Sequence, residues 1–288
     1  MRVNIGLAQI YPKIGDVSAN LEKHLQWIAD AKSQGVDLLV FPELSLTGYQ
    51  VQDLVSEVAI QATPNDPVFA KLLDASQDID VMFGFVQRDT RNRYTISAAY
   101  LSGGQCLHVH KKVYLPTYSM FDEGRYFDQG ESIRAFDTRF GRVGMLICED
   151  FWHISPPYLL WLDGADMLLM HSASPSRGLD AGDRLVSSRW VEQTNQAYGA
   201  FLTNYVVHCN RVGWEDGKNF AGGSSVVDPN GEFVTHGHYF DEKLITAPVD
   251  LNQVTRSRAR LPLLRDEQPF LVQRELARIL SPTGENSR

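Results

Sequence analysis

Glu43, Lys112 and Cys148 each stand where an apolar, strand-like run of the sequence ends. In a layered α/β domain the ends of buried strands open into a crevice, so side chains at these positions can meet. A carboxylate, an ammonium and a thiol in one crevice provide a base, an oxyanion stabiliser and a nucleophile. The three positions together therefore indicate acyl-transfer chemistry.

Each of these residues also has an ordinary explanation when it is taken alone. A free cysteine is more often a packing residue than a nucleophile, and an acid after a strand is usually a solvated surface group. Cys148, however, ends its apolar run and is followed at once by two acids, whereas a filling residue would lie within the run. We therefore interpret Cys148 as the reactive thiol, and Cys106 and Cys209 as structural.

The elements that must position these residues follow from the hydrophobic periodicity. The pattern predicts an amphipathic helix over 18–34, with Ser18 at its start and Gly35 at its end, and further helices near 65–77 and over 182–198. A Pro-Asn-Gly turn predicts a hairpin within 222–235. Apolar or alternating runs predict strands over 2–9, 37–42, 80–87, 94–101, 105–112, 141–148, 166–171, 199–208 and 243–249. Helices between some strands and hairpins between others indicate an α/β fold with mixed sheets.

Composition limits the classes of function. The chain has 288 residues, 43% hydrophobic content and a net charge of −8, which fits one globular domain over 1–288. The lack of a basic cluster beyond Lys111-Lys112 argues against nucleic-acid binding. No apolar run reaches the ~20 residues of a membrane helix, and no signal-peptide block precedes the first strand, so we expect a cytoplasmic protein. The spacing of the three cysteines and of the histidines predicts neither a disulfide framework nor a metal site.

Five motifs in order give the chain a specific resemblance. It resembles the nitrilase, or carbon–nitrogen hydrolase, superfamily, and within it the glutamine-hydrolysing (glutaminase) domain of glutamine-dependent NAD synthetases, here as a stand-alone chain. The motifs are Pro42-Glu43-Leu44-Ser45-Leu46-Thr47-Gly48-Tyr49, Lys112-Val113-Tyr114-Leu115-Pro116-Thr117-Tyr118, Phe121-Asp122-Glu123-Gly124-Arg125-Tyr126-Phe127, Ile147-Cys148-Glu149-Asp150-Phe151-Trp152 and Ser172-Ala173-Ser174-Pro175.

The resemblance implies a four-layer αββα sandwich and a role for each catalytic candidate. Glu43 is then the general base, Cys148 the nucleophile and Lys112, rather than its neighbour Lys111, the oxyanion stabiliser. The backbone N–H of Glu149 is the second oxyanion donor in this scheme. Glu123 matches a second glutamate of the superfamily, which holds the lysine and shapes the pocket. No cofactor and no metal are needed for this reaction.

The resemblance also implies a substrate pocket, with one departure from the pattern. Related glutaminase domains carry a glycine and a basic residue after Ser-Ala-Ser-Pro, whereas here Gly178 is followed by Leu179 and Asp180. Arg177 or Arg184 can take the place of that basic residue by another path. The departure leaves the identity of the amide open. The residues that match the glutamine pocket are Tyr49, Tyr118, Phe121, Glu149 and Ser174.

Several functions compete on this evidence. The leading hypothesis is a cysteine amidohydrolase that releases ammonia from a small carboxamide, with glutamine or another ω-amide as the first expectation. The alternatives are a glutaminase subunit that feeds a separate synthetase, a nitrilase, and a non-catalytic scaffold. The resemblance implies a homo-oligomer, a dimer or larger. The tail from about 253, basic and then apolar, is an arm for a partner subunit or a helix docked on its own domain.

Overall fold

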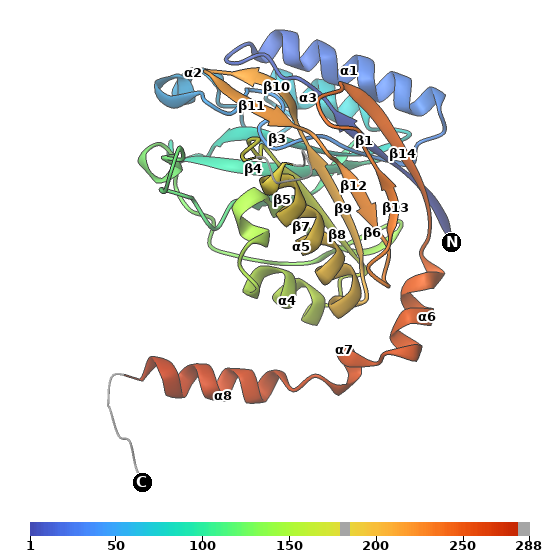
Figure 1. Ribbon diagram of the computed structural model, residues 1–288. Helices are drawn as coiled ribbons and strands as arrows, with labels where there is room; N and C mark the ends of the chain where they lie inside the picture. The colour runs from blue at the N-terminus through green and yellow to red at the C-terminus, as the bar shows by residue number, and fades with distance from the viewer. Residues whose placement is uncertain (179–184, 282–288) are drawn as a thin grey trace.

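Two six-stranded sheets lie face to face in the computed structural model, which describes residues 1–178 and 185–281 (Figure 1). The first sheet has the order β14-β1-β2-β3-β4-β5, in which β1, β2 and β3 are parallel and the other pairs antiparallel. Its strands are β1 (Arg2–Gln9), β2 (Leu38–Val40), β3 (Asp80–Arg88), β4 (Tyr94–Ser102), β5 (Gln105–Lys111) and β14 (Lys243–Asp250).

The second sheet has the order β13-β12-β9-β8-β7-β6, with a parallel centre of β7, β8 and β9. A separate hairpin, β10–β11, leaves the end of β9. The strands are β6 (Phe136–Thr138), β7 (Gly141–Ile147), β8 (Met167–Ser172), β9 (Tyr205–Asn210), β10 (Val212–Glu215), β11 (Lys218–Ala221), β12 (Ser225–Val227) and β13 (Phe233–His236).

Alternation along the strands builds three apolar layers. In β8, Met167 and Leu169 join the core between the sheets, whereas Leu168 and Met170 join the core under the outer helices. Because both faces of the central strands are covered, their sequences are continuous apolar runs. Four layers of secondary structure enclose these cores, and the predicted αββα sandwich with mixed sheets is confirmed.

Helices cover the outer face of each sheet. Helix α1 (Val17–Ser33) and helix α3 (Pro67–Ala75) pack on the first sheet, while α4 (Ser155–Leu162) and α5 (Val186–Leu202) pack on the second. The short elements are η1 (Gln52–Leu54), α2 (Val55–Val58), η2 (Glu123–Arg125) and η3 (Cys148–Phe151). Within the described ranges no helix is long and apolar enough to cross a bilayer.

Two local predictions were wrong. Asp16, rather than Ser18, caps α1, because its carboxylate accepts from the Ala19 N–H at 3.0 Å. The α5 helix runs to Leu202, past the predicted strand start at 199, and β9 begins only at Tyr205. Gly199 allows the longer helix to lie against the turn after β12, since a Cβ there would be 2.7 Å from the Asp228 carbonyl oxygen.

The C-terminal segment leaves the body of the molecule (Figure 1). It contains α6 (Asn252–Arg260), α7 (Leu263–Asp266) and α8 (Pro269–Leu280). Arg258 fixes α6 to the second sheet through bonds to Asp166, the Ala165 carbonyl and Asn204. None of the α8 side chains is buried, and the helix projects away from the two sheets (Figure 1).

Candidate active site

A fully buried lysine is the centre of the site. Lys112 follows β5, and its Nζ donates to Glu43 Oε1 at 2.7 Å and to Glu123 Oε1 at 2.8 Å. Burial alone would lower the pKa of Lys112, but the charges of Glu123 and Glu43 raise it well above its usual value. The lysine is therefore a permanent cation between two carboxylates.

Glu43 is held at both of its oxygens. Oε1 accepts from Lys112, and Oε2 accepts from the backbone N–H of Ala173 at 2.7 Å, just beyond β8. The side chain has no exposed surface. Glu43 thus bridges the two sheets, because β2 leads into it from the first sheet and β8 supplies its partner from the second.

Cys148 stands at a sharp turn where β7 passes into η3. Its φ of 45° lies in the left-handed region, which is rarely occupied by residues other than glycine. Burial, followed by the charge of Glu43, raises the pKa of the thiol well above its usual value, while the Lys112 cation opposes this shift. The resting thiol is therefore protonated and lies within electrostatic reach of both groups.

Asp150 joins the cysteine turn to the lysine segment. Its Oδ1 accepts from the Val113 and Tyr114 N–H groups, both at 3.0 Å, and its Oδ2 bonds Ile147 N–H at 3.1 Å and His110 Nε2 at 2.8 Å. Burial would raise the pKa of Asp150, but the bonds from His110 and the backbone hold it below its usual value. One carboxylate therefore fixes Lys112 relative to Cys148.

Glu123 closes the network from a one-turn helix, η2. Its Oε1 accepts from Lys112 and also from the hydroxyl of Tyr49 at 2.5 Å. Burial raises the pKa of Glu123 to about 7, although the Lys112 cation lowers it and Glu43 raises it further. Glu123 therefore changes its charge near neutral pH.

The thiol opens into a cavity of about 560 Å³. Four of the five predicted substrate-binding residues line it, namely Tyr118, Phe121, Glu149 and Ser174. Tyr49 is placed differently: it lines a separate cavity of about 140 Å³, and its hydroxyl is bonded to Glu123. The remaining described residues of the larger cavity wall are Trp152, Pro175, Arg177, Gly178, Val186, Ser187 and Trp190.

Charged groups of both signs face the larger cavity. Glu149 accepts from the Tyr118 hydroxyl at 3.0 Å, and the Arg177 guanidinium lies 5.0 Å from the centre of the Phe121 ring. Arg177 also donates to the Ser119 hydroxyl at 3.3 Å. Leu179, Asp180 and Arg184, on which the sequence departure depends, lie outside the described residues.

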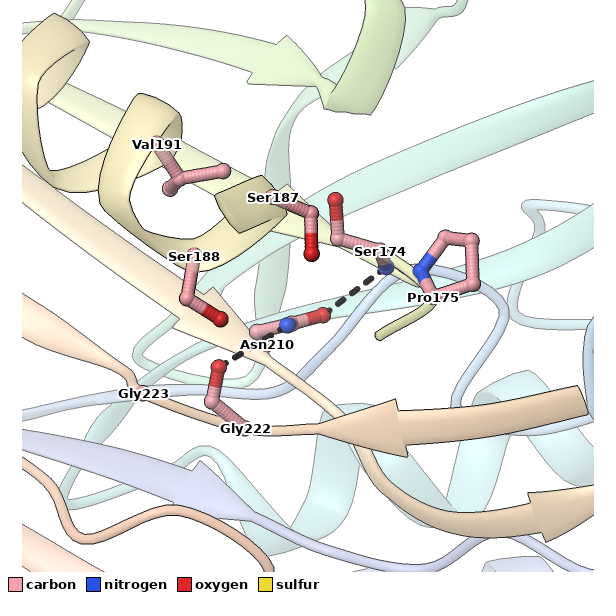
Figure 2. A pocket seen from close by; sticks show the side chains of 8 residues that line it. All are labelled: Ser174, Pro175, Ser187, Ser188, Val191, Asn210, Gly222 and Gly223. Atoms are coloured by element: carbon pink, nitrogen blue, oxygen red, sulfur yellow. Dashed lines mark hydrogen bonds between the residues drawn. The ribbon is translucent and has the colours of Figure 1, made fainter. Parts of the chain in front are cut away.

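Ser174 is held from behind by an asparagine on β9. Asn210 Oδ1 accepts from the Ser174 N–H at 2.9 Å, and its Nδ2 donates to the Gly222 carbonyl at 2.9 Å (Figure 2). Figure 2 shows these bonds among the residues that line a small cavity beside the start of α5. The cavity has a volume of about 10 Å³, close to the size of one water. The backbone of Ser174 is thus tied to β9 through one side chain.

Comparison with known proteins agrees with this geometry. The model of the family described as Carbon-nitrogen hydrolase matches residues 4–259. The chain belongs to the carbon–nitrogen hydrolase family. As a member of that family it is a hydrolase acting on carbon–nitrogen bonds, as expected from the motifs.

The relatives of this carbon–nitrogen hydrolase support the narrower resemblance as well. It is 34% identical over 259 residues to a glutamine-dependent NAD(+) synthetase of Thermotoga maritima, covering 88% of this chain and 43% of the relative. The NAD+ synthetase structure from Acinetobacter baumannii superposes with a TM-score of 0.78 at 32% identity, over 88% of this chain and 47% of that one. The structure of a carbon–nitrogen hydrolase from Helicobacter pylori has a similar fold, with a TM-score of 0.82 at 22% identity, over 96% of this chain and 99% of that one. The chain therefore spans about half the length of its NAD synthetase relatives.

Some residues of the site were missed from the sequence. Asp150 was noted only as an acid after the cysteine, and Ala173 contributes through its backbone, which no side-chain pattern reveals. Asp150 had one signal, its place two residues beyond a strand-ending cysteine. Asn210, by contrast, lies two residues beyond the strand predicted over 199–208 and was not singled out.

Proposed function

We propose that this chain is a cysteine-dependent amidohydrolase that cleaves a small carboxamide through a thioester and releases ammonia. The observation that carries the proposal is the buried Glu43–Lys112–Glu123 network within electrostatic reach of a protonated thiol on a cavity wall. Its parts supply a base, a fixed cation and a nucleophile, which acyl transfer requires.

The first half-reaction forms the thioester. Cys148 Sγ bonds to the carboxamide carbon while Glu43 takes the thiol proton, which leaves the Lys112 ammonium positive. The carbonyl oxygen becomes an oxyanion, stabilised by Lys112 and the Glu149 N–H. Glu43 then passes its proton to the nitrogen, the C–N bond breaks, and ammonia leaves.

The second half-reaction restores the enzyme. A water molecule attacks the thioester carbon while Glu43 takes one of its protons. The C–S bond then breaks, the proton returns to the Cys148 sulfur, and the carboxylic acid departs. Glu123 and Ala173 remain in place throughout, because they hold Lys112 and Glu43 rather than exchanging protons with the substrate.

The cavity favours the ω-amide of an amino acid as the substrate. Glu149 can accept from an α-ammonium group, and Arg177 can bind an α-carboxylate, while Phe121 and Tyr118 contact the aliphatic stem. Arg177 lies on the cavity wall, where its guanidinium donates to the Ser119 hydroxyl at 3.3 Å. Arg177 thus takes the place of the basic residue that the sequence lacks after Gly178.

The test compares the wild-type protein with Cys148→Ala. Each is incubated with glutamine, asparagine, other ω-amides, carbamoyl amines and simple nitriles, and released ammonia is measured. We expect turnover of an ω-amide by wild type and none by the variant. Equal ammonia release by both proteins, or turnover of nitriles alone, would contradict the proposal.

A second candidate is a glutaminase subunit for a separate synthetase. It is favoured by the relatives, whose printed name is glutamine-dependent NAD(+) synthetase and of which this chain matches less than half. Strong stimulation of glutamine hydrolysis by an ammonia-dependent synthetase with its acceptor present would support it. Full activity of the chain alone, unchanged by such a partner, would favour the free-standing amidase.

We also propose that the chain forms a homo-oligomer through its C-terminal arm. Helix α8 exposes apolar side chains along its length, including Phe270, which is 80% exposed, and Ile279, which is 64% exposed. Such a surface on a projecting helix indicates a partner. Light scattering during gel filtration should show a dimer or larger for wild type and a smaller species for Phe270→Glu/Ile279→Glu. A wild-type monomer would contradict this.

A further inference from the structure

A buried ion pair lies behind the site and is not part of the reaction described above. Arg211 follows β9, has no exposed surface, and donates through Nη1 to Glu215 Oε2 at 2.5 Å. Glu215 ends β10 and is 4% exposed. Within the described residues, Arg211 Nε and Nη2 have no hydrogen-bond partner. Burying a guanidinium so incompletely satisfied is costly, which points to a use other than packing.

The acidic member of this pair holds the loop that follows Glu43. Glu215 Oε1 accepts from the backbone N–H groups of Tyr49 at 2.7 Å and Gln50 at 2.6 Å. Gly48 permits this approach: its φ is +79°, and a Cβ there would lie 2.9 Å from Glu215 Oε2. The carboxylate therefore fixes the backbone of Tyr49 directly.

The ring of Tyr49 is fixed from the same hairpin. Phe220, on β11, lies edge-on to Tyr49 with ring centres 6.2 Å apart, and the Arg211 guanidinium stacks 4.3 Å from the Phe220 ring centre. The Tyr49 hydroxyl then reaches Glu123 Oε1, the same oxygen that accepts from Lys112. An unbroken chain of contacts thus connects the ion pair to the catalytic cation.

We propose that the Arg211–Glu215 ion pair is a positioning device, which places the Tyr49 hydroxyl on Glu123 and thereby holds Lys112 in its catalytic position. The inference rests on the proposed function and adds three residues to it. Arg211, Glu215 and Tyr49 are positioning residues, because they act through Glu123.

Removing the hydroxyl gives the first expected result. A hydrogen bond to a carboxylate favours its charged form, so Tyr49→Phe makes Glu123 harder to ionise. The acidic limb of the pH profile of kcat/KM should move to higher pH by about one unit, the shift expected for one hydrogen bond to a charged group. The charged and titratable groups that face Glu123 are Lys112, Glu43, Tyr49 and Cys148.

The ion pair gives the second expected result. Glu215→Gln keeps an oxygen that can accept from the loop N–H groups but removes the negative charge. The acidic limb of the pH profile of kcat/KM should therefore move to higher pH, by less than it does in Tyr49→Phe. In the double variant Tyr49→Phe/Glu215→Gln the acidic limb should lie at the same pH as in Tyr49→Phe alone, because Glu215 acts through the Tyr49 hydroxyl. An unmoved limb in Glu215→Gln, or shifts that add in the double variant, would overturn the proposal.

Matched controls come from the far end of the first sheet. The buried Tyr100 hydroxyl donates to Asp80 Oδ2 at 2.7 Å, and Asp80 also pairs with Arg139 Nε at 2.9 Å. Tyr100→Phe and Asp80→Asn therefore remove the same kinds of bond away from the site. Both should lower the thermal midpoint and leave the pH limb unchanged, which separates positioning from general stability.

Two further measurements keep the test decisive. If Glu215→Gln does not fold, Arg211→Gln/Glu215→Gln leaves no lone buried charge and carries the same expectation. The pH dependence of Cys148 alkylation by iodoacetamide, with Cys148→Ala as the blank, reads the same cluster without turnover. Failure of the wild-type protein to hydrolyse any amide would contradict the proposed function. A pH profile of Cys148 alkylation that shifts in Tyr49→Phe but not in Glu215→Gln would contradict the positioning role of the Arg211–Glu215 ion pair.

Discussion

Replacing Lys112 by methionine tests the central claim about the site. The ammonium is 0% exposed and contacts two carboxylates at 2.7 and 2.8 Å, so its loss leaves Glu43 and Glu123 buried without a cation. Removing one partner of a buried ion pair costs about 3–5 kcal/mol. Loss of an oxyanion donor lowers kcat by on the order of 100- to 1000-fold. Lys112→Met should therefore lose both stability and turnover.

The pH dependence of that loss has a definite sign. The Lys112 cation lowers the pKa of Glu123 and burial raises it, so without the cation Glu123 binds its proton still more tightly in the folded than in the unfolded state. Stability relative to wild type should then be highest in acid and fall as the pH rises towards and through neutrality. Turnover of the best ω-amide and urea unfolding, each measured from pH 5 to about 8, check the two effects.

The neighbouring lysine supplies the control for this experiment. Lys111 lies on the opposite side of the strand end and has no ion pair among the described residues, so Lys111→Met should change stability by no more than about 0.5 kcal/mol. Its turnover should match wild type. Wild-type turnover by folded Lys112→Met, or equal losses in the two variants, would refute the reasoning.

Three further predictions concern residues around this centre. Asp150→Asn should cost about 3–5 kcal/mol in urea unfolding and most of the turnover, because an amide cannot accept from four N–H groups; near-normal turnover would show that the clamp is dispensable. For Glu123→Gln, the free energy of unfolding relative to wild type should rise between pH 4.5 and about 7. Over this interval the wild-type glutamate ionises in the unfolded state but stays protonated in the folded state, so wild type loses stability as the pH rises. A difference that does not change with pH would contradict this. Arg177→Met should raise KM for the ω-amide about 10- to 100-fold, as expected for one lost bond between charged groups, with Arg177→Lys intermediate; equal effects on an uncharged amide would argue against a carboxylate contact.

The sequence was a good guide to the strands and to the residues at their ends. Buried parallel strands are continuous apolar runs, and a polar side chain that ends such a run is conspicuous, as Glu43 and Cys148 are. The hydrophobic periodicity predicted the strands and helices, and the resemblance supplied the order of the layers that they form. It failed at the end of α5, because Gly199 lowers helix propensity and only the packing against the β12 turn reveals why glycine is there.

The residues that the sequence could not assign act through geometry over long sequence separations. Glu215 contacts Tyr49 across 166 positions, and Glu43 contacts Ala173 across 130. In both cases a backbone N–H is the donor, and every residue except proline carries one, so no residue type marks the contact. Tyr49 shows the same difficulty: the resemblance implied a substrate contact, and only the structure shows that its hydroxyl donates to Glu123.

The charges of the site explain why the thiol must stay protonated at rest. Glu43 and Lys112 balance each other, and Glu123 adds a second carboxylate that is half ionised near neutral pH. A thiolate at Cys148 would add a further negative charge in a buried space with one cation, which is why burial and Glu43 raise its pKa. In the proposed reaction the proton therefore moves to Glu43 as the C–S bond forms, and the negative charge passes to the substrate oxygen beside Lys112. By this mechanism the site would keep its net charge constant, with the Lys112 cation balanced by the Glu43 carboxylate before attack and by the oxyanion after it.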